Sequence, residues 1–102
     1  MKNTFLAIQK RYLVFRGDIK YLIDIIQKKI KKEKIRILYL DFSEVSFFSR
    51  SFTDEFLNMI EDFRKKKLII KIVNLKPKLE KFLWQVKKRK KEIRKEINKT
   101  RS

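Results

Sequence analysis

Four acidic side chains lie in and near the polar stretch 43–50, and grouped carboxylates could do chemistry. Such carboxylates can act as general acid and base or bind Mg²⁺. The chain contains no His and no Cys, which excludes Ser-His-Asp triads, thiolate nucleophiles, zinc fingers and disulfides. Its single glycine, Gly17, excludes glycine-rich phosphate loops. We expect a solvated acidic rim near one end of a sheet, in a protein that is not an enzyme and uses no metal and no cofactor; the four residues are Asp41, Glu44, Asp54 and Glu55.

A second candidate for chemistry is Ser51, which lies at the predicted start of a helix. Ser51 and Asp54 have the spacing of a capping-box variant, so the ordinary interpretation of Ser51 is a helix N-cap. The alternative is a phosphorylation site. A helix N-terminus stabilises a phosphate, and Arg50 could pair with it, whereas Asp54 and Glu55 would repel it. Both interpretations remain open at this point.

The C-terminal part of the chain is rich in basic residues. Nine of them spread around one helix cannot all face the same way, so one side alone could contact phosphates, without sequence readout. Trp84 precedes this segment and could stack on a base or cover the edge of the core. The basic residues are Lys87, Lys88, Arg89, Lys90, Lys91, Arg94, Lys95, Lys99 and Arg101.

The net charge of +17 is unevenly distributed along the 102 residues. Residues 41–63 carry one basic and six acidic side chains, whereas the segments on both sides are basic. Such a field attracts nucleic acids, anionic lipids or acidic proteins. A Lys-rich genome or a high growth temperature could produce the same composition. The charge alone does not decide between a partner and a compositional bias.

The elements that must position these residues alternate between strands and helices. Residues 4–8 and 11–15 are β-prone and could form a hairpin or one bent edge strand. The apolar segments 35–40 and 68–73 predict buried strands, the first of them central and covered on both faces.

Three amphipathic helices are predicted from apolar residues spaced three and four apart. The first runs from Asp18, taken as its N-cap, to about Lys32; the second begins near Ser51 and is closed by 65–67; the third begins at Pro77. The order β(β)αβαβα implies an α/β fold with a small, mostly parallel sheet and helices packed on it. The basic half of the third helix should extend beyond the core.

The segment 40–51 resembles the STAS domain of anti-sigma-factor antagonists, in which a strand ending Leu-Asp-(Leu/Phe) leads through a short loop to a Ser at a helix start. It is still more similar to a STAS-like family of unknown function, whose Asp-Phe-Ser and Ser-Phe-x-Asp-Glu signature matches 41–43 and 51–55. The segment 73–77, followed by Leu79, Phe82 and Leu83, resembles the last strand and helix of that fold. The resemblance covers roughly residues 10–86.

This resemblance implies a protein-interaction module of a partner-switching circuit, with Ser51 at the position that a kinase phosphorylates. Residues expected to bind the partner are Ser43, Glu44, Ser49, Arg50, Ser51, Asp54 and Glu55. The alternative hypothesis is a nucleic-acid-binding protein that uses Lys87, Lys88, Arg89, Lys90, Lys91, Arg94 and Lys95.

We divide the chain into a STAS-like domain, 1–86, and a basic helical extension with a tail, 87–102. The longest uninterrupted apolar run is far shorter than the ~20 residues that a membrane-spanning helix needs. No secretory signal is expected, so we predict a cytoplasmic protein.

Overall fold

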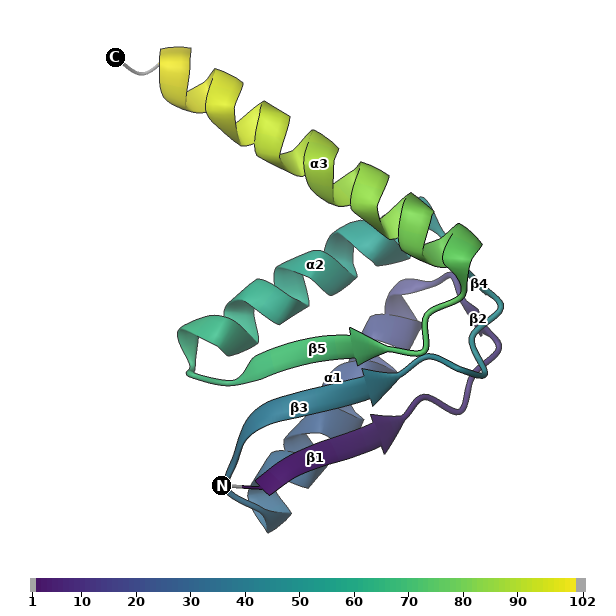
Figure 1. Ribbon diagram of the computed structural model, residues 1–102. Helices are drawn as coiled ribbons and strands as arrows, with labels where there is room; N and C mark the ends of the chain where they lie inside the picture. Colours follow the sequence, from purple (N-terminus) through teal and green to yellow (C-terminus); the bar gives the residue numbers. More distant parts are fainter. Residues whose placement is uncertain (1, 101–102) are drawn as a thin grey trace.

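A parallel sheet lies at the centre of the computed structural model, which describes the backbone of residues 2–100 and the side chains of residues 4–91 (Figure 1). Its strands are β1 (Lys2–Ala7), β3 (Ile35–Asp41) and β5 (Ile69–Val73), in the spatial order β1-β3-β5. Both neighbouring pairs are parallel. The predicted α/β class and the central position of residues 35–40 are confirmed.

The first two helices pack on one face of this sheet (Figure 1). α1 (Arg16–Lys32) leads from β1 to β3, and α2 (Arg50–Lys65) leads from β3 to β5. Because both connections step in the same direction across the sheet, right-handed crossovers put both helices on the same side. The core lies between them and the sheet and contains Leu22, Leu38 and Phe56.

The prediction that the central strand is covered on both faces is therefore wrong. On β3, Leu38 and Leu40 are buried beneath the helices, whereas Tyr39 on the opposite face is only half-buried. There Tyr39 stacks on Phe5 of β1, with ring centroids 4.8 Å apart, and Phe5 remains 64% exposed. The apolar residues on this face are shielded mainly by one another.

The hairpin and the bent strand predicted for the N-terminal segments are both wrong. Residues 4–8 lie largely in β1, whereas β2 (Tyr12–Leu13) belongs to a separate small sheet and pairs in parallel with β4 (Phe47–Phe48). Leu13 and Phe48 are buried and extend the core beyond the end of the main sheet. Strand β4 lies within the polar stretch 43–50, where no strand was predicted, because two residues are too few to show a period.

Helix α1 also begins differently from the prediction, which took Asp18 as its N-cap. The helix starts at Arg16 and Phe15 occupies the N-cap position. The Asp18 carboxylate accepts hydrogen bonds from the backbone N–H groups of Val14 and Phe15, at 2.8 and 2.9 Å. Asp18 thus reaches back from the first turn to fix the chain before the helix.

Strand β5 is an edge strand rather than a fully buried one. Ile70 is buried, but its neighbour Ile69 is 46% exposed. Two residues with left-handed backbone conformations frame the strand: Lys67, with φ of 69°, ends the turn after α2, and Asn74, with φ of 57°, begins the turn toward the third helix. Asn tolerates this conformation better than most residues, whereas Lys does not share that preference.

Helix α3 (Pro77–Thr100) begins at the predicted proline and runs unbroken across the boundary proposed at residues 86 and 87. Its first turns contribute the buried side chains of Leu79 and Val86. The second half extends away from the sheet, as Figure 1 shows. The helix therefore has an anchored half and a protruding half.

Candidate functional site

The loop that follows β3 is held by Asp41, at the end of that strand. Its carboxylate accepts hydrogen bonds from the Ser43 backbone N–H at 2.9 Å and from the Asn74 side-chain amide at 3.1 Å. These bonds hold the pKa of Asp41 below its usual value, and the bond from the Ser43 N–H has the largest effect. Asp41 thereby joins the loops after two neighbouring strands, which is a structural role.

Helix α2 begins at Arg50, and its N-cap is Ser49 rather than Ser51. The Ser49 hydroxyl accepts a hydrogen bond from the Phe52 N–H at 3.1 Å and donates one to the Val14 carbonyl at 2.9 Å. Thr53 reinforces this start by donating its hydroxyl hydrogen to the Ser49 carbonyl at 2.7 Å. The identification of Ser51 as the cap is wrong because Ser49 is already held in place from both sides.

The starts of α1 and α2 are connected through Val14. Its carbonyl receives the Ser49 hydroxyl, and its N–H donates to Asp18, which also pairs with the Lys10 ammonium at 2.8 Å. The hydrogen bond from Lys10 is the main reason that the pKa of Asp18 lies below its usual value. The two helix N-termini are therefore fixed next to each other.

This arrangement leaves Ser51 exposed in the first turn of α2, where it lines a shallow hollow of about 260 Å³. Asp54 and Glu55 line the same hollow, and so does Arg16 from the start of α1. Arg16 was not predicted as a site residue from the sequence. No local signal could have pointed to it, because only the packing of α1 against α2 brings it near Ser51.

Five of the seven predicted partner-binding residues fall into two separate groups, whereas Ser49 caps α2 and the exposed Arg50 begins it, and neither lines these hollows. Ser51, Asp54 and Glu55 share the hollow beside Arg16, whereas Ser43 and Glu44 line another one with Arg11 and Lys76. Asp54 also lies 3.7 Å from the Lys90 ammonium. The expected acidic rim is thus divided by basic side chains. Among the residues that the structure describes, no three acidic side chains are close enough to hold a metal ion.

The basic residues of α3 also differ in their surroundings. Lys87, Lys88, Arg89 and Lys91 are exposed, but the Lys90 ammonium donates hydrogen bonds to the Asp54 carbonyl at 2.8 Å and to the Asn58 side chain at 3.0 Å. Trp84 is 63% exposed, with the Lys88 ammonium 5.5 Å from the centre of its ring. The side chains of Arg94 and Lys95 lie outside the described part of the structure. Within that part, no helix has the length and apolar character needed to span a membrane.

Comparison with known proteins gives a family but no individual relative. Neither the curated proteins nor the solved structures contain a significant match to the chain. A family model described as the STAS domain matches residues 12–101, from β2 to the end of α3. The match includes the paired helix starts, the hollow beside Ser51 and the basic helix. With most of its length covered by this model, the chain belongs to the STAS domain family.

Proposed function

We propose that this STAS domain is a non-enzymatic regulatory module that binds a protein partner through the end of the molecule where α1 and α2 begin. The observation that carries the proposal is the exposed Ser51 in a shallow hollow between the two helix starts. Its surroundings carry both signs of charge, because Arg16 faces the hollow from α1 while Asp54 and Glu55 face it from α2. Such a surface suits a partner with complementary charges.

Phosphorylation of Ser51 is the proposed means of regulation. A phosphate would add about −1.5 to −2 charges at the N-terminal end of α2, where the helix dipole and Arg16 favour an anion. It would also increase the repulsion of an acidic partner and the attraction of a basic one. The Ser51 hydroxyl is available for this because Ser49, not Ser51, caps the helix.

The test combines mass spectrometry with measurements of partner binding. We expect phosphate on Ser51 in protein purified from its native cells, and we expect Ser51→Asp to change the set of proteins captured by the purified domain. Gln27→Glu is the matched control, because it adds one negative charge at an exposed position far along α1. Phosphate absent under several growth conditions, together with identical capture by Ser51→Asp and wild type, would rule out the switch.

A second candidate function is nucleic-acid binding through α3. The observation that favours it is the continuous helix that extends beyond the sheet, with Lys87, Lys88, Arg89 and Lys91 exposed along it (Figure 1). Phosphate contacts by such a helix would release counterions, so the affinity would fall steeply with salt and would not depend on sequence.

Fluorescence anisotropy with a random duplex and a single strand, measured across salt, tests this function. The Lys88→Gln/Arg89→Gln variant should weaken binding and reduce the slope of log affinity against log salt by about two, since each phosphate-binding side chain contributes about one. A chain that ends at Val86 should not bind. If the whole chain fails to bind near physiological salt, the basic helix serves another purpose.

A further inference from the structure

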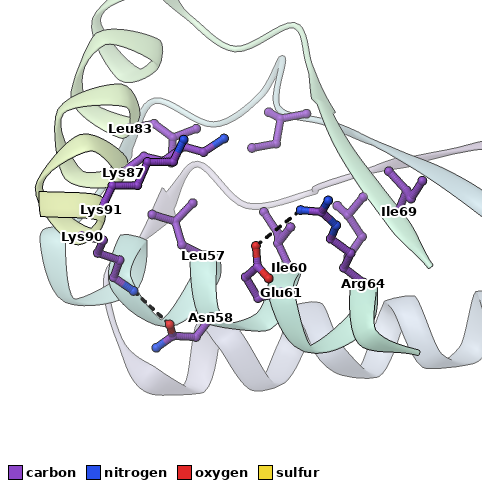
Figure 2. Close-up of a pocket in the computed structure, with 12 residues that line it drawn as sticks. Leu57, Asn58, Ile60, Glu61, Arg64, Ile69, Leu83, Lys87, Lys90 and Lys91 are labelled. Atoms are coloured by element: carbon purple, nitrogen blue, oxygen red, sulfur yellow. Dashed lines mark hydrogen bonds and ion pairs between the residues drawn. The ribbon is translucent and has the colours of Figure 1, made fainter. Parts of the chain in front are cut away.

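A groove lies between α2, α3 and the edge of β5 and shares no lining residue with the Ser51 hollow (Figure 2). It has a volume of about 450 Å³. Figure 2 shows α2 and α3 as two of its walls and β5 as the third. Its apolar lining comes from all three elements: Leu57, Ile60, Ile69, Ile70, Ile72 and Leu83.

Basic side chains border this apolar lining. Lys87 and Lys91 are exposed one turn apart on α3 and both line the groove. Lys90 joins α3 to α2 at the same end through Asn58, as Figure 2 shows. On α2, Arg64 lies 3.8 Å from Glu61, the single acidic residue of the lining, in an exposed pair that contributes little to holding either side chain. The groove therefore favours an occupant that is apolar and negatively charged.

Strand β5, the third wall, has one edge along which its backbone N–H and C=O groups pair with no strand of the described chain. In the described part of the chain, β5 pairs with β3 on one side and has no strand on the other. The Phe42 N–H donates to the Val73 carbonyl, so the backbone groups of Val73 point toward β3. Because this direction alternates along a strand, the N–H and C=O groups of Ile70 and Ile72 point outward at the free edge. The side chains of the same two residues line the groove.

These two observations together define one occupant. We infer that an acidic, extended peptide segment of a partner protein adds to β5 as a fourth strand. Its backbone pairs with Ile70 and Ile72, and its apolar side chains enter the groove on alternate residues. Carboxylates at the groove-facing positions next to α3 meet Lys87 and Lys91, whereas side chains on the intervening residues face away from the groove. The groove shares no lining residue with the Ser51 hollow, and the inference does not require phosphorylation of Ser51.

The high positive net charge makes a second copy of this chain an unfavourable occupant of the groove. Two molecules with a net charge of +17 repel each other, whereas an acidic segment is attracted. Lys71 adds to this selection on the opposite face of β5, where it lies beside Tyr39 in the strand register. A lysine at a sheet edge discourages pairing with most strands. An acidic strand avoids this penalty, because its carboxylates can lie beside Lys71 on one face and beside Lys87 and Lys91 on the other.

The test uses a fluorescein-labelled peptide of about eight residues, the length of a typical strand, with Val at the groove-facing positions beside Ile70 and Ile72 and Glu at all others. Fluorescence anisotropy with the full chain at physiological salt should detect binding. A peptide methylated on the backbone nitrogens of its pairing edge should bind about tenfold more weakly or worse, because it loses strand hydrogen bonds. The matched control is the isomer methylated on the opposite edge, which should bind like the parent. A Lys-Val peptide should not bind.

Protein variants test the charge part of the inference. Lys87→Glu/Lys91→Glu should weaken binding by about tenfold or more. Lys28→Glu/Lys32→Glu is the matched control: it changes the net charge equally, at exposed positions one turn apart on α1. This control should alter the affinity by less than about threefold, through the overall field alone. Circular dichroism should show the same helix content in both variants as in wild type.

Amide hydrogen exchange measured by NMR distinguishes an added strand from a peptide that binds as a helix. Strand addition should slow the exchange of the Ile70 and Ile72 amides on binding. The inference is overturned if the Glu-Val peptide does not bind, if the two methylated isomers bind equally, or if these two amides gain no protection. Equal weakening by the two charge variants would also overturn it, since the attraction would then be unspecific.

Discussion

Replacing Ser49 by Ala should be among the most destabilising changes of a small polar side chain in this domain. The substitution removes the acceptor for the Phe52 N–H, and loss of an N-cap costs about 1 kcal/mol. It also removes the donor to the half-buried Val14 carbonyl, which costs roughly another 0.5–1.5 kcal/mol. The free energy of unfolding should therefore fall by about 1.5–2.5 kcal/mol.

Urea unfolding followed by circular dichroism measures this loss directly. With a typical slope of about 2 kcal/mol per molar, the midpoint should fall by about 1 M. Ser51→Ala is the matched control, because Ser51 lies exposed only two residues later and does not cap the helix. Its effect should stay within about 0.5 kcal/mol. Equal losses in the two variants, or a larger loss in Ser51→Ala, would refute the assignment of the cap.

Three further predictions concern pH, backbone strain and the position of α3. The pKa of Asp18 is lowered in the folded state, so its contribution to stability is present above the unfolded pKa, near 4, and is lost as the pH falls through the folded value. Asp18→Asn should therefore reduce the acid dependence of the unfolding midpoint. An unchanged pH profile would contradict this. Lys67→Gly should raise the free energy of unfolding by about 1 kcal/mol in urea titrations, because glycine adopts the left-handed conformation without strain; a loss of stability would contradict it. Lys90→Met removes the hydrogen bonds from α3 to Asp54 and Asn58 of α2, so it should speed amide hydrogen exchange around Val86 in NMR, whereas Lys88→Met should not. Equal exchange in both variants would show that Lys90 does not hold the helix.

The elements with several turns or a long apolar run could be predicted from the sequence. The spacing of apolar residues placed α1 and α2 within three residues of their observed ends, and Pro77 marked the start of α3. The β-prone segment 11–15 contains β2, but β4 and its pairing with β2 could not be predicted in this way, because each strand has two residues and exists through its pairing with the other. Short strands carry no period, so their position depends on the tertiary structure.

The candidate site was predictable in outline but not in its details. Ser51, Asp54 and Glu55 were expected together and do line one hollow. The choice between Ser49 and Ser51 as the cap depends on Val14, which is 35 residues before Ser49 in the chain. The presence of Arg16 at the hollow depends likewise on how two helices pack. The local spacing of residue types does not reveal contacts between residues that are distant in the chain.

The order of the strands in the sheet bears on how the protein folds. In the main sheet, β1 pairs with β3 and β3 pairs with β5, each across about thirty residues of sequence. Neither pairing therefore joins segments from opposite ends of the chain. The unit β1-α1-β3 can close before β5 is available, and β5 then adds to a strand already in place. Growth of the sheet in one direction allows structure to accumulate from the N-terminus while the chain is still being synthesised. The middle strand β3 belongs to both units, and damage to it should therefore slow both steps.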